Sequence, residues 1–314
     1  MRRLSIFFVV AALAASASFF SSCVPFPPIP VKKATPQPPV AGRPAPLGLL
    51  LLARGGEPED GRALEALRNA AEAAAPSALA AGLANPAAIQ RAIDALAARR
   101  IRRILAIPLF AEPQNELVMQ TRFVLGLGPT LSADMINALK QYPRYRTTLF
   151  LEQASSPVPL AWSAPVGNAP VFAGILAKRA RRLSRTPSSE TLVLVGRGSG
   201  IDALDAASVD ALSRLAAALR ARLGLARASA ATLRTDATPQ ARSRAVAALR
   251  EIVDRAAAHG RAIVLLDSVC DDGMEARVRS SLRGLRYAFD PRPLGLESAL
   301  RRWIAGLGRR AADG

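Results

Sequence analysis

The chain has 314 residues, half of them hydrophobic and few aromatic, and carries a formal net charge of +18 at pH 7. This length predicts two domains of ordinary size, and two cysteines are too few for a disulfide framework. All but four of the 42 basic residues are arginine. They are scattered without interleaved aromatic residues, which argues against nucleic-acid binding and leaves an anionic membrane surface or an acidic small molecule as partner.

The first 23 residues are predicted to be an export signal. A basic start, Met1-Arg2-Arg3, precedes an apolar run at residues 4–15 that is short for a membrane span. The end, Phe20-Ser21-Ser22-Cys23, resembles a bacterial lipoprotein signal, with Cys23 as the lipidated first mature residue. Phe20 stands where that pattern prefers leucine. Cleavage after residue 17, giving a soluble secreted protein, and an uncleaved membrane anchor are the alternatives.

A proline-rich linker is predicted at residues 24–46, which include nine prolines. Such a run forms neither a helix nor a central strand and behaves as an extended, semi-rigid spacer. It suits a tether between a membrane anchor and a folded domain, and a disordered remnant of the leader is the alternative.

The first folded domain is predicted at residues 47–186. Four leucines at residues 49–52 run into Ala53-Arg54-Gly55-Gly56, which is typical of a buried parallel strand followed by a tight glycine turn. Further strands are expected at residues 77–84, 101–110 and 145–152, and helices after Arg62 and at residues 86–98 and 171–183. This alternation predicts a doubly wound, mostly parallel sheet flanked by helices.

The second domain, predicted at residues 187–314, repeats this order. A strand at residues 191–195 meets a second glycine turn, Gly196-Arg197-Gly198-Ser199-Gly200. Both turns therefore place an arginine, Arg54 or Arg197, directly after an apolar run. Strands are further expected at residues 228–235, 262–266 and 285–289. Leucines at helical spacing between Leu212 and Leu223 predict a long helix, and two more helices are expected at residues 239–258 and 297–307.

From residue 47 onward the chain resembles the sirohydrochlorin chelatases, the class II metal chelatases of the cobalt and siroheme pathways, in their tandem two-domain (CbiX-like) form. The segments that carry the resemblance lie in both halves, at residues 50–56, 79–98, 101–110, 120–126, 170–184, 192–199, 273–275 and 282–287. The resemblance implies two tandem chelatase-like domains, a polyanionic tetrapyrrole as ligand, and Co2+ or Fe2+ as a substrate metal, with no permanently bound cofactor.

The sequence departs from this family at its histidines. In the family, the first turn reads Gly-His-Gly-Ser and a second histidine follows the third strand. Here Arg54 and Arg197 take the first place in the two halves, and Gln114 falls near the second. A guanidinium stays protonated and accepts no hydrogen bond, so it cannot ligate a cation, but it binds carboxylates well.

These turns predict an anion site that would hold the carboxylates of the macrocycle. Its residues are Arg54, Gly55 and Gly56 in the first half and Arg197, Gly198 and Ser199 in the second. Solvated arginines on glycine loops are the alternative. A phosphate-binding nest at residues 196–200 is less favoured because the turn lacks the P-loop Lys-Ser/Thr and the spacing of a dinucleotide-binding turn.

Glu112, Gln114 and Glu116 are candidate metal contacts after the strand at residues 101–110. In the second half, Cys270, Asp271, Asp272 and Glu275 follow a strand in the same way. Carboxylates and a thiolate can hold a metal without histidine, although acidic loop residues are more commonly just solvated and Cys270 suits an inert thiol.

Two other conspicuous residues are expected to be structural. His259, the only histidine, follows the helix at residues 239–258 and fits a C-terminal cap, where a donor suits the last carbonyls. Trp303 lies on the apolar face of the last helix, where a core or interface role is expected.

These observations leave three hypotheses for the function. The first is an envelope-located chelatase-like enzyme that binds a tetrapyrrole and inserts a divalent metal. The second is a degenerate relative that binds its ligand without inserting a metal. A structural envelope protein without a ligand is the third hypothesis. The replaced histidines favour binding without insertion, and export disfavours a cytoplasmic biosynthetic step.

Overall fold

The computed structural model describes residues 47–54, 60–82, 84–113, 115–128, 136–137, 140, 152–270 and 273–313. These residues all belong to one compact unit, Ala34–Gly314. The predicted signal and proline-rich linker, at residues 1–46, lie outside the described residues. Within the described part of the chain, no helix combines the length and the apolar character needed to cross a membrane.

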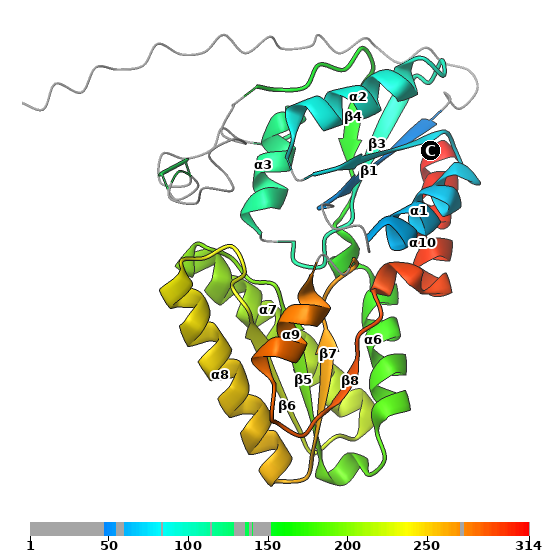
Figure 1. The fold of residues 1–314 in the computed structure, drawn as a ribbon. Helices are drawn as coiled ribbons and strands as arrows, with labels where there is room; N and C mark the ends of the chain where they lie inside the picture. Colours follow the sequence, from blue (N-terminus) through cyan, green and yellow to red (C-terminus); the bar gives the residue numbers. More distant parts are fainter. Residues whose placement is uncertain are drawn as a thin grey trace, which may run out of the picture. The chain divides into compact units, whose positions relative to one another are not determined.

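The first sheet has four parallel strands in the order β2-β1-β3-β4 (Figure 1). They are β1 (Leu47–Ala53), β2 (Ser77–Ala81), β3 (Arg103–Pro108) and β4 (Leu160–Trp162). Every residue of β1 is buried, as the run of leucines predicts for a central parallel strand covered on both faces.

Helices α1 (Asp60–Glu72), α2 (Pro86–Ala97) and α3 (Glu116–Val124) connect these strands. The start of α2 shows why the sequence forms a helix there. The Asn85 side chain accepts a hydrogen bond from the Ala88 N–H, and Pro86 takes the first helical position, where its missing N–H costs nothing.

The sequence did not predict the strand at the β4 edge of this sheet. β4 pairs with β3 on the side away from β1, with Ile104 opposite Leu160 and Ala106 opposite Trp162. The strand predicted at residues 145–152 lies outside the described residues except for Glu152, which is not in a strand.

The second sheet repeats the first, with four parallel strands in the order β6-β5-β7-β8 (Figure 1). Its strands are β5 (Glu190–Gly196), β6 (Arg227–Thr232), β7 (Arg261–Leu266) and β8 (Ala288–Asp290). Helices α7 (Asp202–Leu223), α8 (Pro239–Ala258) and α9 (Met274–Ser281) accompany them. The predicted α/β class with two doubly wound parallel sheets is confirmed.

Each half of the chain also contributes a helix to the other half. Helix α6 (Pro170–Leu183) contacts α7, β7 and β8 of the second sheet, and α10 (Ser298–Asp313) contacts α1 and β1 of the first (Figure 1). One apolar core accordingly contains residues of both sheets. The predicted domain boundary between residues 186 and 187 stays a prediction.

His259 and Trp303 have the structural roles predicted for them. His259 is the C-cap of α8, and its Nδ1 lies 2.8 Å from the carbonyl oxygen of Arg255, to which its N–H donates. Trp303 is partly buried and packs against the main core.

Candidate functional site

Polar and charged side chains gather where the parallel strands end. Arg54 follows β1 and Arg197 follows β5, while an acidic residue follows closely after each of β3, β6 and β7. These three are Glu112, Asp236 and Asp267. The carboxyl ends of parallel strands share one edge of a sheet, where ligands of open α/β sheets bind. Hydrogen bonds and ion pairs connect the residues of the first sheet to those of the second.

The glycine turn after β5 holds the carboxylate of Glu112. The Arg197 N–H donates to Glu112 Oε1 at 2.5 Å, and the Gly198 N–H lies 3.1 Å from each carboxylate oxygen. Glu112 comes from the loop after β3 and is only 8% exposed. The N–H groups of this turn therefore bind a carboxylate of the same protein, and a role of the turn in binding a ligand anion stays a prediction.

Two glycines make this contact possible. Gly198 has φ +75°, and a Cβ there would lie 2.4 Å from Asp205 Oδ1 and 2.6 Å from Thr232 Cβ. A Cβ on Gly196 would lie 2.7 Å from Glu112 Oε1. Side chains at these positions would therefore crowd the turn or the bound carboxylate.

Replacing Gly198 by alanine should destabilise the protein by about 1–3 kcal/mol, because both the left-handed backbone and the lack of space oppose a Cβ. Gly174→Ala is the matched control, since Gly174 lies in α6 and nothing stands within 4 Å of the added Cβ. That control should be neutral or gain about 0.5–1 kcal/mol from helix propensity. Urea unfolding of both variants makes the comparison, and equal effects at the two positions would contradict the strained turn.

A second carboxylate, that of Glu116, binds the same turn. Ser199 Oγ donates to Glu116 Oε2 at 2.6 Å, and the Gly200 N–H lies 3.4 Å from Oε1. Glu116 is the first residue of α3, and Asn115 before it caps the helix by accepting from the Leu117 N–H at 2.9 Å. The start of α3 thereby fixes where the carboxylate points.

The two predicted arginines meet on one acidic side chain. Arg54 Nη2 lies 3.0 Å from Asp236 Oδ2, and Arg197 Nη1 lies 4.0 Å from the same oxygen. Arg197 Nη1 also donates to Thr235 Oγ1 at 2.6 Å. The side chains of Arg54 and Arg197 are 11% and 9% exposed, and that of Asp236 only 1%. The arginine of the first turn and the arginine of the second therefore belong to one site.

Arg234 stabilises the turn by binding its backbone carbonyls. Its Nε donates to the Ser199 carbonyl at 3.0 Å and its Nη2 to the Gly200 carbonyl at 3.0 Å. Its backbone has φ +47°, which is uncommon for a residue other than glycine and costs conformational energy.

Burial changes the acidity of three carboxyl groups in this site. Burial raises the pKa of Glu112 and of Glu116, although hydrogen bonds from the β5 turn oppose the change. Asp267 is 4% exposed and its Oδ1 has no hydrogen-bond partner. Burial, followed by the charge of Glu112, raises the pKa of Asp267 to about 8, so this group is protonated at neutral pH.

The predicted metal contacts have other partners or lie outside the described residues. Gln114, Asp271 and Asp272 lie outside them, as do Gly55 and Gly56 of the predicted anion site. Glu112 and Glu116 bind the β5 turn, and no three His, Cys, Asp or Glu residues within the described ranges are grouped so as to hold a metal ion. His259 precedes the amino end of β7 and is thus at the opposite edge of the sheet. A metal role for Glu112, Gln114 and Glu116 stays a prediction.

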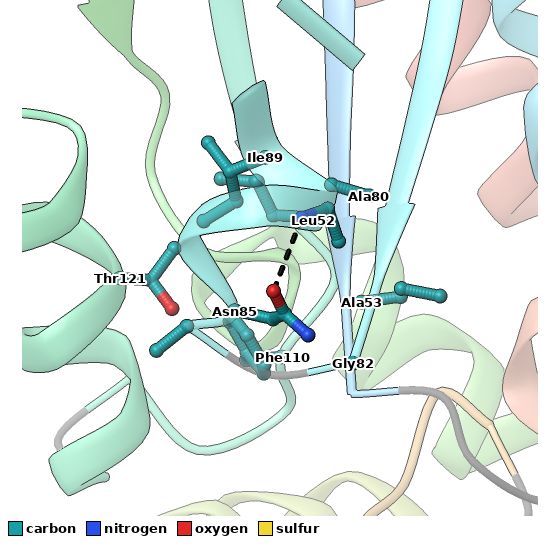
Figure 2. Close-up of a pocket in the computed structure, with 11 residues that line it drawn as sticks. Leu52, Ala53, Ala80, Gly82, Asn85, Ile89, Phe110 and Thr121 are labelled. Atoms are coloured by element: carbon teal, nitrogen blue, oxygen red, sulfur yellow. Dashed lines mark hydrogen bonds between the residues drawn. The ribbon is translucent and has the colours of Figure 1, made fainter. Parts of the chain in front are cut away.

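A small hollow lies beside the carboxyl ends of β1 and β2 (Figure 2). Its lining is mainly apolar, with Leu52, Ala80 and Phe110 around the polar groups of Asn85 and Thr121. The space among these side chains is narrow, with room for about one water molecule. Both polar side chains have partners, since Asn85 caps α2 and Thr121 donates to the Leu117 carbonyl at 2.7 Å. The hollow cannot hold a macrocycle.

Solved chelatase structures share this fold. The chain is similar to the sirohydrochlorin chelatase SirB from Bacillus subtilis subspecies spizizenii in complex with cobalt, with a TM-score of 0.54 and 11% identity over 85% of this chain and 95% of that one. It is also similar to SirB from Bacillus subtilis with Fe3+, with a TM-score of 0.51 and 13% identity over 85% and 95% of the two chains. No protein-family model and no curated protein matches the chain. The likeness therefore establishes a chelatase-like fold.

Sequence reasoning found part of this site and missed the groups that complete it. Arg54, Arg197, Gly198 and Ser199 were predicted as an anion site, and the structure places Glu112 and Glu116 against the second turn. Asp236, Asp267 and Arg234 were not predicted as site residues. Asp236 and Asp267 directly follow predicted strands, whereas Arg234 lies within the strand predicted at residues 228–235.

Proposed function

We propose that the protein binds a polyanionic tetrapyrrole of the sirohydrochlorin class and does not insert a metal into it. The support for the ligand class is the fold shared with SirB, which is described as a sirohydrochlorin chelatase. The observation that carries the proposal is the meeting of Arg54 and Arg197 on the single carboxylate of Asp236.

The arginine pair offers donors suited to a carboxylate. Two guanidinium groups lie against one buried carboxylate, that of Asp236. Arginine binds carboxylates through charge-assisted, often bidentate hydrogen bonds. A ligand with several carboxylates can therefore replace or join Asp236 on these two side chains.

The chemistry of the same residues argues against metal insertion. A guanidinium neither ligates a cation nor accepts a proton, and arginine stands at both positions where the chelatase pattern has its first histidine. The only histidine caps α8 and already bonds to the Arg255 carbonyl. The site thus keeps groups for holding an anion and lacks the imidazole that would handle a metal.

Chelatase activity remains the second candidate function, and Asp267 is the observation that favours it. Placing a divalent metal in a tetrapyrrole displaces the protons of two pyrrole nitrogens, so a group that accepts protons near neutral pH is useful. Asp267 has a pKa of about 8 and lies near the candidate site. Because it is mostly protonated at neutral pH, it would act as the proton acceptor in place of histidine only as the pH approaches 8 and its ionised fraction grows.

An absorbance titration with sirohydrochlorin tests the proposed function. The wild-type protein should bind, and Arg54→Ala combined with Arg197→Ala should bind at least about a hundredfold more weakly, since each charged hydrogen bond is worth about 1.5–3 kcal/mol. The control removes two exposed arginines of equal charge, Arg182 and Arg255, whose side chains are 41% and 66% exposed. Circular dichroism establishes that the variants fold. Equal binding by the two double variants would overturn the role of Arg54 and Arg197.

The proposal places this binding protein outside the cytoplasm, attached to the envelope through a lipid on Cys23. The support is the signal-like pattern of residues 1–23 and the proline-rich tether after it. Mass spectrometry of the membrane fraction tests it: a lipid-modified peptide starting at Cys23 is expected, and an unmodified mature end at residue 18 would exclude the anchor.

A further inference from the structure

We propose that the backbone N–H groups of Arg197 and Gly198 are the binding position for one carboxylate of the ligand, and that Glu112 occupies this position until the ligand displaces it. The inference rests on the proposed function and adds to it a defined subsite and an internal competitor.

The subsite is shaped for a carboxylate. Two consecutive N–H groups converge on Glu112, at 2.5 Å and 3.1 Å from Oε1, and the second also lies 3.1 Å from Oε2. Gly196 leaves the necessary space, since a Cβ there would stand 2.7 Å from Oε1. A planar group with two oxygens fits these donors without any side chain of the turn.

The occupant comes from a distant part of the chain. Glu112 follows β3 of the first sheet, whereas its donors are 85 and 86 residues later, at the end of β5 in the second. The contact is therefore tertiary. Arg234 separately binds the carbonyls of Ser199 and Gly200, and this support would hold the turn when Glu112 leaves.

The surroundings of Glu112 make its carboxylate replaceable. Burial raises its pKa and outweighs the hydrogen bonds from Gly198 and Arg197 and the charge of Arg197. The charge of Glu112 in turn raises the pKa of Asp267, the residue directly after β7. The Oδ1 of Asp267 is buried without a hydrogen-bond partner, so one polar atom near the subsite is available to bond to the ligand. A ligand carboxylate can replace the Glu112 carboxylate at the N–H groups of Arg197 and Gly198 with the same hydrogen bonds, and Glu112 is then free to be solvated.

The test uses acetate as a substitute for the missing carboxylate. In Glu112→Ala the N–H groups of Arg197 and Gly198 lose their anion, so acetate should bind there and raise the melting temperature in a saturable way, at constant ionic strength. Glu116→Ala is the matched control, because Glu116 is also buried in the same region but binds Ser199 and Gly200. Acetate should not stabilise the control or the wild type, and inorganic phosphate should stabilise Glu112→Ala less than acetate does.

A second variant covers the case in which Glu112→Ala does not fold. Glu112→Gln keeps the size of the side chain but competes more weakly for the N–H groups, so it should bind sirohydrochlorin about tenfold more tightly than the wild type. An unchanged affinity in Glu112→Gln, or equal responses of Glu112→Ala and Glu116→Ala to acetate, would overturn the inference. Acetate rescue of Glu112→Ala with no sirohydrochlorin binding by any variant would support the subsite and overturn the proposed function instead.

Discussion

Replacing Asp267 by asparagine should stabilise the protein by a few kcal/mol at pH 9. Asp267 is 4% exposed, its Oδ1 has no hydrogen-bond partner, and no arginine pairs with it among the described contacts. Its ionised form is therefore disfavoured in the folded protein, first by burial and then by the charge of Glu112. Asparagine keeps the shape and never acquires the charge.

The effect should depend on pH in a definite direction. The carboxyl has a pKa of about 8 in the folded protein against an ordinary value of 3.8, so the folded state binds this proton more tightly than the unfolded state. Its contribution is fully present below about pH 3.8 and is lost as the pH rises through about 8. The upper limit of the loss is about 6 kcal/mol, since each pKa unit is worth about 1.36 kcal/mol.

Urea unfolding at pH 4, 6 and 9 measures this difference. Asp267→Asn should match the wild type near pH 4 and exceed it progressively toward pH 9. Asp236→Asn is the control with the opposite sign, because Asp236 is equally buried but pairs with Arg54 at 3.0 Å. Its loss should destabilise the protein at neutral pH. A wild-type stability that does not fall relative to Asp267→Asn above pH 6 would contradict the buried acid.

Replacing Arg179 by alanine should destabilise the protein by roughly 3–5 kcal/mol, the usual effect of removing one partner of a buried ion pair. Arg179 lies on α6 and its side chain is 2% exposed. Its Nε and Nη2 donate to Glu297 Oε1 at 3.1 and 3.0 Å, and it also donates to the carbonyls of Arg292 and Pro293. The substitution leaves one carboxylate and two carbonyls without this donor in the interior.

Arg182, one turn later on α6, is the matched control for Arg179. It pairs with Asp290 Oδ2 at 2.7 Å, but its side chain is 41% exposed. An exposed pair of this kind contributes about 0–1 kcal/mol, and Asp290 keeps Arg292 as a partner at 2.8 Å. Denaturant unfolding of the two alanine variants makes the comparison. Equal losses would show that α6 is not held to the second sheet by the buried arginine.

The sequence predicted the fold most reliably where apolar runs are uninterrupted. The runs at residues 49–52 and 191–195 are in β1 and β5, whose residues are all buried. The helix predicted at residues 239–258 has those bounds as α8, because Thr238 caps it and Pro239 begins it. Weakly apolar segments were placed less well: the last strand, expected at residues 285–289, is β8 at Ala288–Asp290.

Long-range packing set the features that local patterns could not predict. Strand β4 has three residues, none of them fully buried, so neither its length nor its hydrophobicity distinguishes it from a loop. Helices α6 and α10 each pack against the sheet of the other half of the chain. An amphipathic pattern predicts that a helix has a buried face, but it does not indicate which sheet covers that face. The buried Arg179 is the clearest local sign of this packing, since only distant partners satisfy it.

The candidate site shows the same limit. The glycine turn with Arg197 was predicted to bind an anion of the ligand, which stays a prediction, and in the structure its donor groups bind a carboxylate of the protein itself. That the anion is Glu112, and that Arg54 reaches an aspartate 182 residues later, follows from contacts between elements of the two sheets. The spacing of residues along the chain does not predict such long-range contacts.

The most direct test of binding without insertion is the rate at which Co2+ enters sirohydrochlorin in the presence of the purified protein, followed by absorbance. We expect the spectrum to report binding, and the Co2+-dependent change to proceed no faster than in a protein-free control. A faster Co2+-dependent change that Asp267→Asn abolishes would contradict the proposal and identify the protein as a chelatase that uses a buried carboxyl in place of histidine.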